Sequence, residues 1–402
     1  MSAFLFTAVT SLIPFVVMIS LIVTIHELGH FLTGKAFGTA IDRFSMGFGK
    51  AIVSWRDRSG VEWRIGWIPL GGYVKFAGDE NAASMPDKTT LEESRRAIVA
   101  REGPGAEQRY LAFKPLWQRT LVILAGPAAN FLLAVVIFAA FFLAFGEQVT
   151  TPRVQAVLPG EAGQQSGFHT GDLIVAADGR PMRTFEEVQF YVQYRPGVPI
   201  NFTVQRQGAL VHLIARPKTL QEASAFGGTQ SVGRLGLEAA EGGIVHVGPV
   251  KAVSLAVQRT WDVAATTGYA LGRIVTGHMR ADQLHSIVGM VHASGAITKE
   301  AISAAHTAKV SWLVAEAFFL SQLAAVMSVS IGFLNLLPVP TLDGGHLIFY
   351  AYEWVAKRPA AAKVQAAGYR AGLALLLGLM LFATWNDVER LRLFRFIGGL
   401  FS

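Results

Sequence analysis

Residues 21–38 read LIVTIHELGHFLTGKAFG and place the pattern His-Glu-Leu-Gly-His at the end of a long apolar run. Every residue from position 1 to position 25 is uncharged. On a helix, residues four apart lie on the same face, so His26 and His30 can bind one metal ion. Glu27 lies beside them, where a carboxylate can take a proton from a water molecule at the metal. The sequence therefore predicts a hydrolytic metal site at the depth of a lipid bilayer.

The composition is that of a membrane protein. The 402 residues are 52% hydrophobic and only 16% charged, with a mean hydropathy of +0.40, whereas soluble proteins carry about 25% charged residues. The chain has no cysteine, which excludes disulfides and thiolate ligands, so a metal must be bound by His, Asp or Glu. Lys and Arg in cytoplasmic loops account for the net charge of +7, and no basic run indicates binding of nucleic acid.

Four apolar stretches are long enough, or nearly so, to span a membrane as helices. They cover approximately residues 4–26, 120–146, 317–342 and 371–386. The first could instead be a secretory signal peptide, but no Lys or Arg precedes its apolar core and no clear cleavage site follows it. We therefore expect four membrane-spanning helices.

The positions of basic residues predict the orientation of these helices. The loop between the first and second spans carries Lys35, Arg43, Lys50, Arg101, Arg109, Lys114 and Arg119 near its ends. The positive-inside rule places this loop in the cytoplasm, and both termini and residues 147–310 on the other side. Arg390, Arg392 and Arg395 favour the opposite side for the C-terminus.

The cytoplasmic loop contains a stretch of alternating character, residues 47–76. Val61, Trp63 and Ile65 fall on one face of a strand, and Glu62 and Arg64 fall on the other. A Gly-containing turn separates two such runs, which predicts a small antiparallel sheet close to the membrane. The sheet could be a peripheral hairpin, or its edge could pair with an extended peptide; the alternation favours neither.

Residues 152–217 form a compact β-rich unit in the segment outside the cytoplasm. Expected strands cover residues 154–158, 173–177, 200–205 and 210–215, and an expected helix covers residues 185–194. The run SGFHTGDLIVAADGRPM, residues 166–182, resembles the core of PDZ domains of the bacterial protease type. Such a domain can bind a peptide as an added strand, or serve only as a cap or spacer. Residues 250–276 then predict an amphipathic helix at the membrane interface.

A third metal ligand is expected from residues 335–347, NLLPVPTLDGGHL, which follow the third apolar run. Catalytic zinc takes three protein ligands and a water. The prolines stop one helix, and Asp343 begins the next. Asp343 could be a helix N-cap, but it is the only carboxylate between Glu316 and Glu353, so we favour a metal ligand. Asn335 could bind substrate or cap the preceding helix.

Two further features are less specific. Residues 124–134, LAGPAANFLLA, contain small residues that allow close helix packing, and Asn130 could hydrogen-bond to the metal-binding helices. The residues His278, His285, His292 and His306 recur at multiples of seven, which would suit a second metal or a pH sensor. Glycines between them disfavour one continuous helix.

These motifs together resemble the site-2 protease family of intramembrane zinc metalloproteases, in its RseP-like branch. HELGH, GFG with PLGGYVKF, AGPAANF, the PDZ unit and NLLPVPTLDGGHL occur in that order and cover nearly the whole chain. The resemblance implies one Zn²⁺ ion with the ligands His26, His30 and Asp343, the general base Glu27, and the substrate-contacting residues Asn335, Gly71, Gly72 and Tyr73. The sheet that ends in PLGGYVKF would receive the unwound substrate.

The resemblance also implies substrates, partners and location. Family members cleave single-span membrane proteins such as anti-sigma factors, after an upstream site-1-type protease has trimmed them; remnant signal peptides are a further substrate class. The active site would face the cytoplasmic side of a bacterial inner membrane, and the PDZ domain the periplasm. Tandem PDZ domains are typical of RseP itself, whereas this chain has room for one.

The predicted fold is an α-helical polytopic membrane protein with about four transmembrane helices, a membrane-associated β-sheet and an extracytoplasmic PDZ-like α+β domain. The expected segments are the first helix with HELGH (1–34), the cytoplasmic loop with the sheet (35–118), the second helix (119–146), the PDZ domain (152–217), a post-PDZ segment with amphipathic helices (218–310), the third helix with the Asp343 motif (311–357), the fourth helix (366–387) and a tail (388–402). Two alternatives are a PDZ-containing membrane binding protein with a structural metal site, in which Glu27 would be dispensable, and a metal transporter, which would need several such sites.

Overall fold

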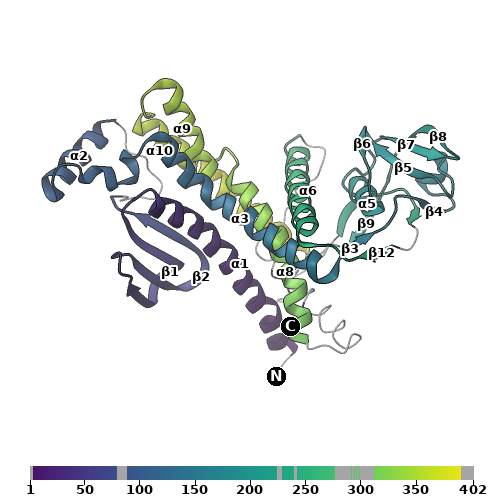
Figure 1. Ribbon diagram of the computed structural model, residues 1–402, viewed down its shortest axis with the longest axis horizontal. Coiled ribbons are helices and arrows are strands. Elements are labelled where there is room, and N and C mark those ends of the chain that lie inside the picture. The colour runs from purple at the N-terminus through teal and green to yellow at the C-terminus, as the bar shows by residue number, and fades with distance from the viewer. Residues whose placement is uncertain are drawn as a thin grey trace.

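The computed structural model describes residues 3–78, 88–223, 229–239, 242–276 and 312–390, together with residues 291, 294, 296 and 298. The four regularly spaced histidines and residues 391–402 of the expected tail lie outside the described residues. In Figure 1, the long helices α1, α3 and α8 pack together at the centre, the β1–β2 sheet lies beside α1, and the strand-rich unit lies at the other end of the molecule.

Four of the described helices are long and apolar enough to cross a membrane, as predicted. The candidate spans are Leu12–Ala36 in α1 (Ala3–Ala36), Leu116–Phe145 in α3 (Leu116–Phe145), Glu316–Asn335 in α8 (Trp312–Asn335) and Ala362–Trp385 in α10 (Ala362–Arg390). The fourth helix begins earlier than its apolar run and includes Lys363 and Arg370. Side chains of this kind can lie along an apolar surface while their charges reach water.

Small residues allow α1 and α3 to approach each other closely. A methyl group at Gly29 of α1 would lie 2.2 Å from the carbonyl oxygen of Ala125 in α3, so the two backbones are almost in contact there. Further along, Phe15 and Ile22 of α1 are buried against Ala324 of α8. Close contact between small residues, as between Gly29 and Ala125, is the usual way in which membrane helices pack, because lipid provides no hydrophobic force between them.

The predicted sheet consists of β1 (Ile41–Arg56) and β2 (Glu62–Phe76), which pair in antiparallel fashion. The first half of β1 lies between two parts of β2, since Phe44 faces both Val74 and Trp63. Both strands bend to make this possible, and β2 does so at Gly71, whose φ of +109° is accessible to glycine but strained for other residues. The sheet packs on α1 through Phe44, whose ring lies 5.4 Å from that of Phe31.

Three short helical segments separate the sheet from α3. They are α2 (Lys88–Glu102), η1 (Ala106–Arg109) and η2 (Leu111–Phe113). Arg101 and Tyr110 both donate hydrogen bonds to Glu102, at 2.6 and 2.5 Å, which holds the end of α2 against the η1 segment. Lys114 then donates to the backbone carbonyl of Phe37 at the end of α1. The connection is thereby fixed to the same end of the helix bundle as the sheet.

The strand-rich unit has the strands and helix that the sequence predicted. Its elements are β4 (Val154–Val157), α4 (Ala162–Gln165), β5 (Leu173–Ala177), β6 (Arg180–Pro181), α5 (Phe185–Gln193), β7 (Ile200–Arg206), β8 (Ala209–Ala215), β9 (Lys218–Ala223), β10 (Thr229–Arg234) and β11 (Leu237–Ala239). A four-stranded sheet has the order β6-β5-β7-β8, and β11 pairs with β4. Leu235 is buried in the same core as Val154 and Phe202, so the unit includes strands after residue 217. Those strands are short and polar, and their alternation is too weak to be recognised from the sequence.

The strand-rich unit is joined to the membrane helices at two points. The strands β3 (Glu147–Val149) and β12 (Gly243–Val245) pair directly after α3. The expected amphipathic helix follows as α6 (Pro249–Val275), and its small residues Ala256 and Ala264 are buried in one cluster with Phe138 of α3 and Val329 of α8. The helix therefore packs against two of the membrane-spanning helices.

Candidate metal centre

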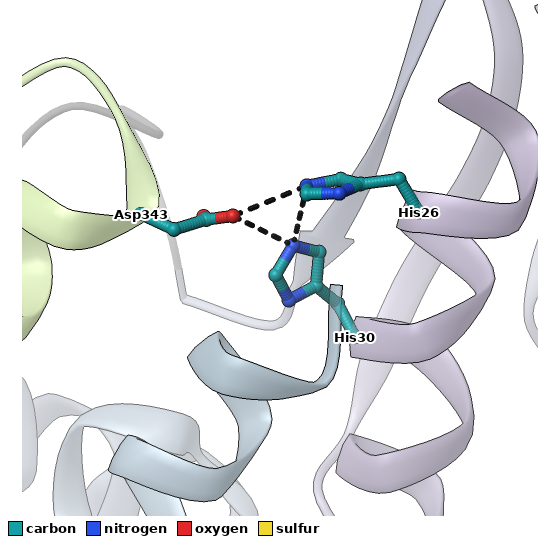
Figure 2. Close-up of side chains that lie close together, drawn as sticks. All are labelled: His26, His30 and Asp343. Atoms are coloured by element: carbon teal, nitrogen blue, oxygen red, sulfur yellow. Dashed lines mark hydrogen bonds and ion pairs between the residues drawn. The ribbon is translucent and has the colours of Figure 1, made fainter. Parts of the chain in front are cut away.

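Three side chains from two distant parts of the chain converge at one point. His26 and His30 extend from α1, and Asp343 begins α9 (Asp343–Ala356). The Asp343 Oδ2 atom lies 3.1 Å from His26 Nε2 and 3.6 Å from His30 Nε2, and the two Nε2 atoms are 3.2 Å apart (Figure 2). The histidines are only 6% and 7% exposed. The predicted set of three ligand atoms is thus brought together inside the protein.

The donor atoms fit a bound cation. Among the described residues, Asp343 Oδ2 is buried without a hydrogen-bond partner, although it faces two imidazole nitrogens. A buried carboxylate oxygen without a partner is costly, and a metal ion placed among these three atoms would satisfy it. Two imidazoles and one carboxylate, with a fourth position left for water, are a ligand set of catalytic zinc.

The local sequence explains how Asp343 reaches this point. Helix α8 ends at Asn335, and the chain folds back on itself before α9 begins. A methyl group at Gly344 would lie 2.1 Å from the carbonyl oxygen of Leu337, and one at Gly345 would lie 2.3 Å from Pro340 Cα. The two glycines therefore permit the tight return. Leu342 occupies the N-cap position of α9, and Asp343 is the first helical residue with its Oδ2 atom facing the two histidines, so the geometry favours the ligand role over the N-cap role.

Glu27 connects the ligand cluster to the sheet. Its Oε2 atom accepts a hydrogen bond of 3.1 Å from the backbone N–H of Val74 in β2. A methyl group at Gly72 would lie 3.4 Å from Glu27 Cγ, and Tyr73 lines the same cavity as Glu27. Gly71 instead packs against the ring of Phe48, which a methyl group there would meet at 2.3 Å. Of the three expected sheet residues, Gly72 and Tyr73 thus lie beside the site, and Gly71 lies one residue away.

Two asparagines contact His26 from opposite sides. The Asn335 Nδ2 atom lies 3.4 Å from His26 Nε2, and the Asn130 Nδ2 atom lies 3.3 Å from His26 Nδ1. His30 has a different partner, since its Nδ1 atom is 2.8 Å from the backbone carbonyl oxygen of Val122 in α3. Residues of α3 therefore contact both histidines on the side away from Asp343.

A cavity of about 330 Å³ connects the ligand cluster to the region of α2 and the end of α9. Its wall includes His346, whose ring nitrogen lies 3.3 Å from the hydroxyl of Tyr369, and an ion pair of 2.6 Å between Arg119 and Glu353. His346 was not among the site residues predicted from the sequence. The available signal was its position three residues after Asp343, which places both on one side of a helix.

Comparison with known proteins agrees with this geometry. The model of peptidase family M50 matches residues 14–379. The chain belongs to peptidase family M50, the site-2 protease family. It is 48% identical to the metalloprotease MmpA of Caulobacter vibrioides, over 97% of this chain and 98% of that one. It is 41% identical to a putative zinc metalloprotease of Agrobacterium fabrum, over 94% and 96% of the two chains.

The M50 protease is accordingly a zinc metallopeptidase, with four candidate membrane helices in the part of the chain that the structure describes, rather than a binding protein with a structural metal. Zinc is its metal, and the cluster of His26, His30 and Asp343 fits that ion. A solved PDZ domain of the SdrC-like protein from Listeria monocytogenes is also similar, with 14% identity and a TM-score of 0.19, and covers 23% of this chain and 90% of its own.

Proposed function

We propose that this M50 protease cleaves peptide bonds in or near the transmembrane segments of single-span membrane proteins, such as anti-sigma factors. The proposed zinc ligands are His26, His30 and Asp343, and the proposed general base is Glu27. A membrane-embedded site suits such substrates, because a peptide bond within a spanning helix is protected by its own hydrogen bonds and cannot leave the bilayer easily.

The hydrogen bond between Glu27 and the N–H of Val74 is the observation that carries the proposal. In an antiparallel pair, alternate residues direct their N–H and C=O groups away from the partner strand. Val74 faces Phe44 in the ladder and points its N–H toward Glu27, so Gly72, two residues earlier, presents its polar groups at the same edge. An extended substrate that pairs with this edge would lie directly beside Glu27 and the ligand cluster.

The roles of the chain's residues follow from these positions. A zinc ion bound to the three ligands would act as a Lewis acid that lowers the pKa of water and polarises a peptide carbonyl. The Glu27 carboxylate takes the proton of the attacking water and later delivers it to the nitrogen of the leaving amine. The Asn335 amide donates toward the carbonyl oxygen that gains negative charge. Gly72 pairs with the substrate backbone and holds it extended, because a helical substrate would keep its carbonyl groups hydrogen-bonded, and the Tyr73 side chain contacts the substrate from the cavity wall.

Cleavage of a tagged single-span reporter in proteoliposomes tests the proposal, with Glu27→Gln compared with wild type. The substitution keeps the size of the side chain but removes the base. We expect one zinc per chain to remain and the cleavage rate to fall by a factor on the order of 100 to 10,000. Glu92→Gln, on the exposed face of α2, is the matched control and should cleave normally. Equal rates for Glu27→Gln and wild type would refute the assignment of Glu27.

We also propose that the protein lies in a bacterial inner membrane, with the PDZ-like unit in the periplasm, and that a site-1-type protease acts first. The basic residues of the loop between α1 and α3 support this orientation. The chain has no cysteine, so single cysteines report their side without background. Ala209→Cys, in the exposed β7–β8 hairpin, should react with an impermeant maleimide from the periplasmic side, whereas Glu92→Cys should not. The reverse pattern would invert the proposed orientation.

A further inference from the structure

Asn130 is a polar side chain in the middle of a membrane-spanning helix, and it is fully buried at 0% exposure. Its backbone carbonyl accepts a hydrogen bond of 2.9 Å from the Ser328 hydroxyl of α8. A methyl group at Gly332 of α8 would lie 3.1 Å from Asn130 Cβ. The residue is therefore held between α8 and the metal-binding histidine, and its amide reaches His26 Nδ1 at 3.3 Å.

The chemistry of the His26 ring determines what this amide must do. The Nε2 atom of His26 faces the other ligand atoms, at 3.1 Å from Asp343 Oδ2 and 3.2 Å from His30 Nε2. A neutral imidazole that gives its Nε2 lone pair to a metal carries its proton on Nδ1. That Nδ1–H group is a donor, and it needs an acceptor in this buried position.

The Asn130 amide can provide that acceptor. Its Oδ1 atom is buried and has no hydrogen-bond partner among the described residues, while its Nδ2 atom faces His26 Nδ1. This orientation suits the tautomer with the proton on Nε2. A half-turn of the amide exchanges the two atoms, so that Oδ1 accepts from Nδ1–H and the tautomer required by a metal is stabilised. An amide can serve either tautomer, whereas a carboxylate can only accept.

His30 shows the same principle with a different partner. Its Nδ1 atom lies 2.8 Å from the backbone carbonyl oxygen of Val122, which can only accept. The backbone thus fixes the proton of His30 on Nδ1 and leaves Nε2 free for a metal. For His26 the corresponding acceptor is a side chain, so it can be removed by mutation.

We infer that Asn130 is a positioning residue of the zinc site, whose side-chain oxygen accepts a hydrogen bond from His26 Nδ1–H and so holds His26 in its metal-binding tautomer and orientation. The inference rests on the zinc ligands proposed above. Groups in this role are known to change metal affinity by about 10- to 100-fold when removed. Asn130 would therefore act on the metal through His26 and not by contact with substrate.

Zinc affinity of the purified full-length protein, measured by competition with a chromophoric chelator, tests the inference without any substrate. Asn130→Leu removes the acceptor in a side chain of similar length, and we expect the affinity to fall by about 10- to 100-fold. Asn130→Asp keeps an acceptor and should retain most of the affinity. Ser328→Ala disturbs the same contact between α3 and α8 but leaves the amide intact, and it should bind zinc as the wild type does.

The absorption spectrum of the Co²⁺-substituted protein is the second readout, because its bands depend on the ligand geometry. We expect a changed spectrum for Asn130→Leu and a native one for Ser328→Ala. If Asn130→Leu does not fold, Asn130→Ala takes its place. Wild-type affinity and spectrum in the folded Leu or Ala variant would overturn the inference, as would an equal loss in Ser328→Ala, which would indicate a packing role. If the wild type binds no zinc through His26, the proposed ligand set itself fails.

Discussion

Gly126 of α3 lies directly against the two histidines proposed to bind the metal, and its replacement by alanine should separate metal binding from folding. A methyl group at this position would lie 2.3 Å from His30 Nε2, 2.5 Å from His30 Cε1 and 2.9 Å from His26 Cε1. Ordinary contacts between such atoms are about 3.5 Å or longer. The His30 ring would therefore have to move by about 1 Å, whereas metal ligands tolerate roughly 0.2 Å.

The two expected effects differ in size. The displaced atoms belong to side chains and not to the backbone, so the cost to folding should stay within the roughly 1–3 kcal/mol typical of overpacking. Alanine also favours a helix over glycine by about 1 kcal/mol, which offsets part of that cost. For zinc, loss of a correctly placed ligand should lower the affinity by about 100-fold or more, which is roughly 3 kcal/mol.

Two other glycines provide matched controls for Gly126→Ala. At Gly29 the methyl group would meet backbone atoms, at 2.2 Å from the Ala125 carbonyl oxygen and 2.7 Å from its carbon. A backbone cannot turn aside as a side chain can, so Gly29→Ala should separate α1 from α3 and lower stability clearly. Gly378 of α10 has open space around it, and Gly378→Ala should change neither property.

The assay combines thermal unfolding in detergent, with a chelator present, and zinc titration of the same samples. Measuring stability with a chelator removes the contribution of bound zinc, which would otherwise raise the melting temperature of the variants that bind it. We expect Gly126→Ala to melt close to the wild type and to bind zinc weakly, and Gly29→Ala to melt early. Gly126→Ala with wild-type zinc affinity would refute the reasoning, because His30 could then not lie where the structure places it.

Three further predictions concern other parts of the molecule. Arg119→Leu should lower the free energy of unfolding by about 1–3 kcal/mol, because it leaves Glu353 without its partner at the cavity wall. Adding Glu353→Leu to the same chain should restore most of that free energy. A double-mutant cycle measured by thermal unfolding that shows no coupling between the two residues would contradict this. Asp172→Asn should destabilise the PDZ-like unit by about 2–3 kcal/mol, since the buried carboxylate is 2.8 Å from Arg206; unchanged hydrogen exchange in the intact protein would argue against it. Burial alone would raise the pKa of Asp172, but its hydrogen bonds to Arg206 prevail and lower it. The stabilisation by the Asp172 carboxylate should therefore be complete above about pH 4 and decline as the pH falls further. Hydrogen-exchange data, corrected for the intrinsic exchange rate at each pH, measure this decline.

Much of the architecture could be predicted because the membrane imposes a strong pattern on the sequence. Long apolar runs indicated the four spans, and the four-residue spacing of His26 and His30 indicated a shared helix face. Asp343 could be singled out as a candidate ligand because a carboxylate at membrane depth is rare and a metal ligand was missing, and the structure places it beside both histidines. These inferences depend on local periodicity or on the cost of burial, and both can be read along one chain.

Other features could not be predicted because they depend on which segments meet in space. The alternation of residues 61–67 indicated a strand, but it could not show that Phe44 of β1 has strand neighbours on both sides. The pairing of β11 with β4 joins residues about 80 positions apart in the sequence. The sequence indicated that Asn130 could hydrogen-bond to the metal-binding helices, and it does contact His26. Which residue it would contact depends on the rotation of α3 about its axis, which small residues on several sides left undetermined.

Helix α3 supplies none of the proposed metal ligands, yet the position of both histidines depends on it. Its Val122 carbonyl faces His30 Nδ1, its Asn130 amide faces His26 Nδ1, and Gly126 between them leaves room for both rings. These three residues are four apart and lie on one face of the helix. Such spacing explains why the motif of the second span combines small residues with one amide: the small residue lets the rings approach, and the polar groups on either side orient them. A change of either kind should therefore affect the metal before it affects the fold.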